Sequence, residues 1–125
     1  MSAPNIVNAT SLYGKMAYGA LTTSAATMLN NAVSSNKLLK VLWMRITNID
    51  GVNTADVTVS YYTQDDIGGT AYKVAYTIAV PADAAIDLLE KTGPIFLEED
   101  RSLGGLASAN GDLEYLIAYE EYDDA

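Results

Sequence analysis

The chain has 125 residues, no cysteine and no histidine, and its sixteen acidic and seven basic residues give a net charge of −9. This length suits a single domain with one hydrophobic core. The composition excludes disulfides, metal sites built on thiolate or imidazole ligands, and nucleophilic catalysis that uses Cys or a Ser–His pair.

The amino-terminal segment, residues 1–11, is polar apart from one β-branched pair, Ile6-Val7. Pro4 keeps this segment from being helical. Two interpretations stay open: a frayed terminus, or an extended arm that adds a strand to the sheet of a neighbouring subunit. The domain that follows is expected to span residues 12–125 and to end in an acidic tail.

The rest of the chain alternates apolar and polar residues with period two, which is typical of strands with one buried face. The alternation predicts about eight strands, at 12–21, 25–31, 38–49, 55–63, 71–80, 85–90, 95–97 continued by 102–109, and 112–121. Turn residues separate these runs at intervals typical of β-sandwiches. The expected fold is therefore all-β, a single antiparallel β-sandwich of the jelly-roll or Ig-like kind with an extended amino-terminal arm.

The strand at 38–49 differs from the others because its apolar run is nearly continuous. Trp43 and the β-branched residues Val41 and Ile46 favour a strand over a helix here. We expect a central strand that is covered on both sides.

Tyrosine is abundant, with nine residues against one Trp and one Phe. Five of the tyrosines follow the apolar phase of their predicted strands: Tyr61, Tyr72, Tyr76, Tyr115 and Tyr119. This phase places them in the core or at interfaces and argues against an exposed aromatic platform.

Two glycine motifs mark the last third of the chain. Gly104-Gly105 falls inside a strand-like stretch and indicates a bulge or a close backbone contact. Asn110-Gly111 stands between two alternating runs, and it predicts a hairpin that joins 102–109 to 112–121.

Nearly all of the net charge lies at the carboxy-terminal end. Residues 98–125 contain nine acidic residues and one basic residue, Arg101. We expect this end to face solvent, so that docking uses the amino-terminal arm and the neutral faces. The basic residues form no cluster, which argues against nucleic-acid binding, and no apolar run approaches the ~20 residues of a membrane-spanning helix.

Carboxylates are the remaining candidates for chemistry. Asp65-Asp66 could ligate Ca²⁺, but the residues around it lack the ligand spacing of a calcium loop and favour a solvated turn. Glu98-Glu99-Asp100 is also interpreted as a turn. Among sixteen carboxylates some pair will meet the ~5–10 Å separation of a glycosidase, so their number does not indicate catalysis. We expect no enzymatic activity and no cofactor.

An ordered series of short motifs runs through the chain. Its members are Ser2-Ala3-Pro4-Asn5-Ile6-Val7-Asn8, Tyr13-Gly14-Lys15, Thr47-Asn48-Ile49-Asp50-Gly51, Val80-Pro81-Ala82-Asp83, Leu88-Leu89-Glu90-Lys91, Pro94-Ile95-Phe96-Leu97-Glu98-Glu99-Asp100, Ser108-Ala109-Asn110-Gly111-Asp112-Leu113-Glu114 and Tyr119-Glu120. In this order the chain resembles small structural proteins of tailed bacteriophages, of the marine and cyanobacterial type. It departs from them where Ala118-Tyr119 replaces a Ser-Tyr pair. It also lacks the glycine often found between Glu99 and Asp100, so the turn after Leu97 is expected to differ in type.

The resemblance implies a non-enzymatic virion protein, assembled in the host cytoplasm, and in particular a capsid decoration (cement) protein. A neck, tail or fibre-associated protein is the alternative. The expected partners are the major capsid protein or other virion structural proteins, with no nucleic acid and no membrane. A homo-oligomer, a trimer or a ring, would multiply weak binding by each copy. The candidate partner-binding residues are Pro4, Ile6, Val7, Tyr13 and Tyr62.

An alternative of another class is a carbohydrate- or receptor-binding β-sandwich module. Such a module needs several tyrosine rings on one exposed face or loop end, beside acidic loops that could hold Ca²⁺ and sugar hydroxyls. The placement of the tyrosines therefore distinguishes the two hypotheses.

Overall fold

The structure is a computed structural model that describes residues 11–89 and 93–123, and within these ranges it contains nine strands and no helix. The strands are β1 (Ser11–Ala20), β2 (Ala26–Asn31), β3 (Lys37–Asn48), β4 (Ala55–Gln64), β5 (Gly68–Val80), β6 (Ala85–Leu89), β7 (Ile95–Leu97), β8 (Arg101–Ala107) and β9 (Leu113–Asp123). Since these residues form no helix, they include none that is long and apolar enough to span a membrane. The predicted all-β class is confirmed, and the strand positions agree closely.

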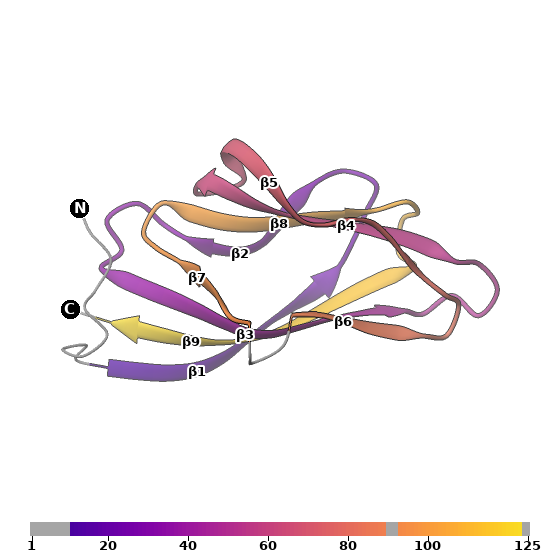
Figure 1. Cartoon of the computed structure of the whole chain (residues 1–125), viewed down its shortest axis with the longest axis horizontal. Coiled ribbons are helices and arrows are strands. Elements are labelled where there is room, and N and C mark those ends of the chain that lie inside the picture. Colours follow the sequence, from indigo (N-terminus) through magenta and orange to yellow (C-terminus); the bar gives the residue numbers. More distant parts are fainter. Residues whose placement is uncertain (1–10, 90–92, 124–125) are drawn as a thin grey trace.

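The strands form two antiparallel sheets that lie one above the other (Figure 1). The first sheet has the order β1-β9-β3-β6, with β7 also pairing with β3, and the second has the order β2-β8-β4-β5. Strands that follow one another in the chain mostly lie in different sheets. The antiparallel pairs β1–β9, β2–β8 and β4–β5 join strands from the two ends of the chain inward, as in a long hairpin that is wrapped into a sandwich. This is the strand order of a jelly roll, which selects that member of the two predicted kinds of sandwich.

Two predictions about the last third are wrong in their topology. The predicted turn at 98–100 is confirmed, but the stretches on its two sides do not form one strand, because β7 pairs with β3 in the first sheet whereas β8 pairs with β2 and β4 in the second. The Asn110-Gly111 turn joins β8 to β9, which belong to different sheets, so it is a crossover and not a hairpin.

The backbone at Asn110-Gly111 explains why this motif predicted a hairpin although the structure has a crossover. Gly111 has the positive φ of 78° that such a turn demands. Its N–H donates to the carbonyl of Leu21, and the Asn110 side-chain oxygen accepts the N–H of Thr23. The motif thus predicts the turn correctly, but its hydrogen bonds are made to the β1–β2 connection.

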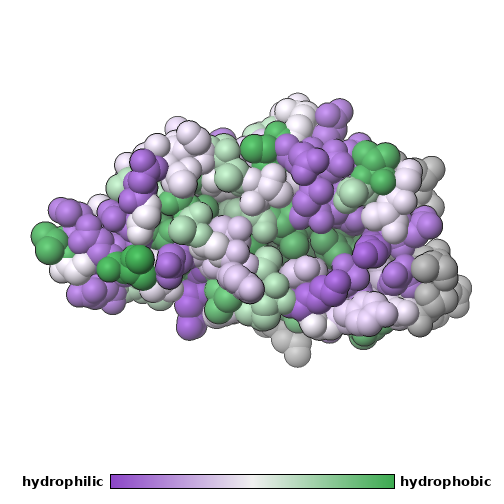
Figure 2. All heavy atoms as spheres, turned by 180° about the vertical axis from the view of Figure 1, so that it is seen from behind, coloured by the Kyte–Doolittle hydropathy of each residue, from purple (hydrophilic) through white to green (hydrophobic). Residues whose placement is uncertain are grey.

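Inward-facing side chains of both sheets form one core. Val41, Met44 and Ile46 of β3 meet Val57 of β4 and Leu103 of β8, and all five are fully buried. Each such side chain stabilises the fold by about 1.5–3 kcal/mol. Seen from behind, apolar residues reach the surface at the height where the two layers meet, between polar residues above and below (Figure 2).

β3 is central in the first sheet, as predicted, but the expectation that it is covered on both sides holds only near Leu38, which is buried, and is wrong from Leu42 to Arg45. The register with β9 shifts between Val41 and Trp43, so Leu42 is an extra residue at a bulge. Leu42 and Trp43 are partly exposed on the outward side of the sheet. The nearly continuous apolar run therefore leaves apolar surface that the described residues do not bury.

The prediction of a close backbone contact at Gly104-Gly105 is confirmed. A Cβ at Gly104 would lie 2.5 Å from Ile67 Cγ2 and 2.9 Å from a ring carbon of Tyr62. A Cβ at Gly105 would lie 2.6 Å from Met28 Sδ. Ile67, in the turn between β4 and β5, can lie over β8 because β8 has no side chain at Gly104.

Two buried asparagines hold the layers together at opposite ends of β3. The Asn31 amide, at the end of β2, donates to the carbonyls of Lys37 and Leu97, both at 2.9 Å. The Asn48 amide, at the end of β3, donates to the carbonyls of Asn53 and Val80, also at 2.9 Å. Sequence reasoning missed both residues, because an asparagine beside a turn reads as a solvated loop residue.

Candidate interaction surface

The outward face of the first sheet carries a line of apolar side chains. The antiparallel register sets Met16 of β1 opposite Ala118 of β9, and Tyr18 opposite Leu116. Together with the neighbouring residues of β1 and β3, these make up what we name the apolar stripe: Leu12, Met16, Tyr18, Leu42, Leu116 and Ala118. Its most exposed members are Tyr18 (75%), Leu12 (56%) and Met16 (48%).

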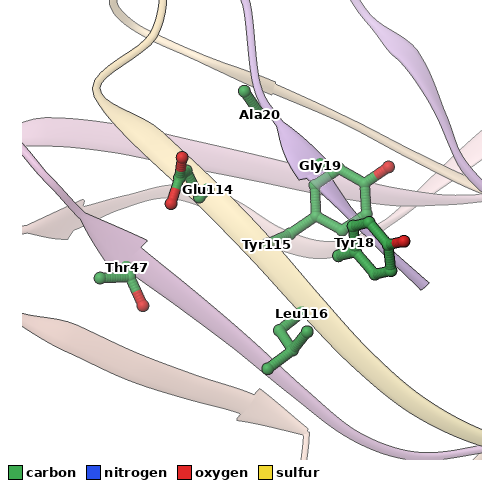
Figure 3. A pocket seen from close by; sticks show the side chains of 7 residues that line it. All are labelled: Tyr18, Gly19, Ala20, Thr47, Glu114, Tyr115 and Leu116. Atoms are coloured by element: carbon green, nitrogen blue, oxygen red, sulfur yellow. The ribbon is translucent and has the colours of Figure 1, made fainter. Parts of the chain in front are cut away.

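The stripe is hollowed at two places. One hollow, of about 370 Å³, lies between β1, β9 and β3, and Figure 3 shows the seven residues that line it, among them Tyr18, Thr47 and Leu116. The other, of about 390 Å³, lies between Met16, Leu42 and Ala118. Each hollow is lined by a single carboxylate, Glu114 in the first and Glu120 in the second. Such open, mainly apolar hollows fit apolar side chains of a partner better than they fit acid–base chemistry, which needs a positioned pair of groups.

Charged groups border the stripe on β3 and β6. The Arg45 guanidinium is 2.8 Å from the Asp87 carboxylate and 4.8 Å from the centroid of the Trp43 ring. The hydrogen bond from Arg45 lowers the pKa of Asp87. Arg45 therefore covers part of the Trp43 ring and supplies a polar rim, as protein interfaces commonly have.

In the part of the chain that the structure describes, β1 forms one edge of the same sheet. Its ten residues pair with β9 in one unbroken register, from Ser11 opposite Asp123 to Ala20 opposite Glu114. The pairings that hold β2, β5 and β6 all contain register shifts, and β7 has three residues. Among the sheet edges that the structure describes, β1 is thus the longest regular one.

An ion cluster lies on the inward side of β1. Glu121 of β9 is buried, and its Oε2 atom is 3.1 Å from Lys15 Nζ and 3.5 Å from Lys37 Nζ. The hydrogen bond to Glu121, supported by its charge, raises the pKa of Lys15. The Lys15 ammonium also lies 5.6 Å from the centroid of the Tyr13 ring. This cluster holds β1 to β9 and β3.

The structure does not bring the predicted site residues together. Tyr13 lies on β1 beside the ion cluster and is about half exposed. Tyr62 lies on β4, in the other sheet, where its half-buried ring packs over Gly104. Pro4, Ile6 and Val7 lie outside the described residues, so their predicted role in partner binding stays a prediction.

The expectation that the acidic carboxy-terminal end faces solvent is wrong for two residues. Glu99 is buried, and its Oε2 atom accepts the N–H of Asn36. Glu121 is buried in the ion cluster. Charge counting alone missed both, because the fold turns these two carboxylates inward toward hydrogen-bond donors.

The tyrosines divide between the core and the surface. Tyr61, Tyr115 and Tyr119 pack against the core, one of the two predicted places, whereas Tyr72 and Tyr76 on β5 are about two-thirds exposed and lie outside the core. Tyr72 lies opposite Tyr61 on the edge strand β5, and register shifts between this pair and Tyr76 change the phase of alternation along β5.

The two exposed rings of β5 do not share a face. Tyr72 is the cross-strand partner of Tyr61, and the Tyr76 ring lies 5.9 Å from the ammonium of Lys73, on the side where Lys73 reaches Ser60. A sugar-binding platform needs several rings side by side, and these two do not provide it.

Comparison with known proteins adds evidence for the fold. No protein-family model matches the sequence, and no match is found among curated proteins. Among solved structures, the chain is similar to one from the Bacillus endospore appendages, which are described as a novel family of disulfide-linked pili. The two chains share 14% sequence identity with a TM-score of 0.54, over 92% of this chain and 88% of that chain. At this identity the similarity shows an all-β sandwich and nothing about function.

Proposed function

We propose that this chain is a non-enzymatic structural subunit that assembles with copies of itself and with other structural proteins. Within this class we propose a virion protein of a tailed bacteriophage, and specifically a capsid decoration protein; a neck, tail or fibre-associated protein is the alternative within the virion. The proposal gives the chain no substrate and no cofactor.

One observation carries the proposal, the exposed apolar stripe on the first sheet. Monomeric soluble proteins seldom expose a contiguous line of apolar side chains unless a partner covers it. Leu12, Met16 and Tyr18 are each about half or more exposed in a row along one strand. A partner that covered this row would bury their apolar area, which contributes roughly 25 cal/mol per Å² before the costs of association.

The fold and the comparisons agree with this role without deciding the particle. Jelly rolls occur in viral capsid and lectin domains, so the fold is compatible with a virion protein and with a sugar-binding module. The similar appendage chain comes from disulfide-linked pili. The present chain has no cysteine, so its residues cannot form the disulfide links named for that family. The virion assignment rests on the ordered sequence motifs.

The amino-terminal arm has its own place in the proposal. We assign Pro4, Ile6 and Val7 to a segment that adds a strand to another virion subunit. Deleting residues 2–10 is expected to abolish incorporation into the particle while the jelly roll still folds. Unimpaired incorporation of the deletion variant would refute the role of the arm.

The experiment that tests the function is to purify phage particles produced from a genome that carries this gene and to identify their proteins by mass spectrometry. The chain is expected among the particle proteins, in a fixed ratio to the major capsid protein. A chain that is abundant in the lysate but missing from the particles would contradict the virion role.

A paired substitution makes the test specific to the apolar stripe. The double variant Leu12→Lys, Met16→Lys is expected to fold and to be lost from the particle. The control is Tyr76→Lys on β5. It changes a large side chain outside the stripe that is 65% exposed, compared with 56% for Leu12 and 48% for Met16. If the control were lost and the stripe variant retained, the docking surface would lie elsewhere.

A further inference from the structure

We propose that β1 pairs with β1 of a second copy of the chain, antiparallel and about a twofold axis, so that the two first sheets become one continuous sheet. This inference rests on the proposed self-assembly, and it names the surface and the partner. A twofold contact uses the same patch on both copies, so one strand supplies both halves of the interface.

The β1 edge is long and regular. A strand can be extended only along an edge whose free N–H and C=O groups are evenly spaced. β1 offers ten residues without a register shift. β5 has a left-handed residue, Thr77 (φ 47°), as well as register shifts, and β6 and β7 are five and three residues long. Among the described edges, β1 of a second copy is therefore the best pairing partner for β1.

Within the described residues, β1 also lacks the usual protection of an edge. Proteins block free edges with lysines, prolines, bulges or covering segments. β1 has no proline and no bulge, and its one charged residue is Lys15. The Lys15 ammonium is held by Glu121 on the inward side of the sheet, so it is not free to guard the edge. At Gly14 even a Cβ would meet nothing within 4 Å.

The charge of the chain also favours contact through β1. Each copy carries a net charge of −9, so two copies repel unless they meet at a surface without acidic groups. β1 contains no acidic residue, and its one basic residue is neutralised within the same copy. Pairing through β1 also sets the two apolar stripes side by side, because the outward residues of both strands then share one face.

The geometry allows a direct test, because the chain has no cysteine of its own. In an antiparallel pair, opposed Cα atoms are about 4.5–5.5 Å apart, which suits a disulfide. A residue two positions from the twofold axis is already about 14 Å from its own copy, since the rise is about 3.4 Å per residue. Single cysteines along β1 therefore report where the axis passes.

The experiment uses four single-cysteine variants of the full chain on the outward face of β1, Leu12→Cys, Gly14→Cys, Met16→Cys and Tyr18→Cys, under mild oxidation. The control is Tyr76→Cys, at an exposed position of β5. Disulfide-linked dimer is expected to peak at position 14 or 16, several-fold above the control, and to be lost at 12 and 18. Equal linkage at all four positions, or none above the control, would overturn the proposal.

Two further measurements separate this result from folding defects and from other occupants of the edge. In a mixture of isotope-labelled and unlabelled wild-type chain, we expect nuclear Overhauser contacts between the β1 strands of two copies, and their absence overturns the proposal without any substitution. The peak at 14 or 16 should survive deletion of residues 2–10. If it disappears, the arm of another copy occupies the edge and β1–β1 pairing is refuted. These measurements use no phage particle. They can therefore refute β1–β1 pairing while the virion role holds, and they can support the pairing even if the chain is missing from the particle.

Discussion

Gly104 is a position where the jelly roll leaves no room for a side chain. Ile67 and a ring carbon of Tyr62 occupy the space that its Cβ would need, and the carbonyl of Ala26 lies 3.0 Å from that point. Ile67 of the β4–β5 turn and the Tyr62 ring of β4 pack against β8 at this residue. Its backbone conformation is ordinary, so close approach and not φ requires the glycine.

Gly104→Ala is therefore expected to destabilise the domain by about 1–3 kcal/mol, the cost of overpacking a tight contact. Urea unfolding measures the change. Gly14→Ala is the matched control, since a Cβ there has open space, and its effect should stay within about 0.5 kcal/mol. Equal stability of the two variants would show that the hairpin does not lie on β8 as described.

Glu121 makes a second residue-scale prediction, on pH. Because Glu121 raises the pKa of Lys15 in the folded state, the stabilisation by Lys15 is complete below its ordinary pKa, about 10.4, and is lost as pH rises through the raised value. Lys37, Tyr13 and Tyr119 face the same cluster. The wild type should lose stability in this alkaline range.

The difference between variants isolates the ion cluster from the titration of the tyrosines. Glu121→Gln is expected to be less stable at neutral pH and to show a smaller alkaline loss than the wild type. Glu114→Gln, at an exposed carboxylate of the same strand, should behave like the wild type. Thermal unfolding from pH 8 to about 11 gives the comparison, and parallel curves for wild type and Glu121→Gln would contradict the role of the cluster.

At the scale of elements, period-two alternation located the strands, because a half-buried strand imposes that period on its side chains. What the pattern could not give was the pairing. β8 and β9 are consecutive in sequence and are joined by an Asn-Gly turn, yet they belong to different sheets. A turn motif specifies local φ and ψ, whereas the choice of sheet depends on contacts distant in sequence, such as that of Gly111 with Leu21.

Bulges account for the errors in side-chain orientation. A bulge shifts the phase of alternation by one residue, so residues beyond it change face. The shift at Leu42 turns Trp43 of β3 outward, and the shifts along β4–β5 put Tyr76 on the opposite face from Tyr72. The apolar stripe was missed for another reason: its β1 and β9 residues become neighbours only through strand pairing, which the alternation does not give.

The turn after Leu97 shows a departure from the phage-protein motifs that the structure explains. Asp100 has a φ of 63°, in the left-handed region that favours glycine. Aspartate tolerates this region better than most residues. Its N–H donates to the carbonyl of Asn31, and its carboxylate accepts the N–H of Asp65. Asp100 can thus hold the left-handed conformation without a neighbouring glycine, because its backbone N–H and its carboxylate both make hydrogen bonds.

The buried asparagines provide the prediction at the element scale. Asn48→Ala leaves the carbonyl of Val80 without its donor, and an unsatisfied buried group costs about 1–3 kcal/mol. Hydrogen exchange should quicken at the β5–β6 end of the sandwich more than at the β2–β3 end, and Asn31→Ala should show the opposite bias. A uniform change in both variants would mean that the asparagines do not hold separate ends.

At the scale of the whole molecule, self-association must overcome a net charge of −9 on each copy. Salt screens this repulsion, since the Debye length falls from about 10 Å at 0.1 M to about 3 Å at 1 M. Association through the nearly uncharged β1 edge should therefore strengthen as salt is added. Sedimentation equilibrium at low and high salt measures it, and weaker association in high salt would indicate an interface held by ion pairs between copies.

The central claim is that the first sheet, with its β1 edge and apolar stripe, is the surface buried on assembly. Hydrogen–deuterium exchange of the wild-type chain, dispersed and assembled, tests it most directly. The account predicts that amides of residues 11–20 become protected on assembly while those of β5 do not change. Protection confined to β5, or to the second sheet, would contradict it.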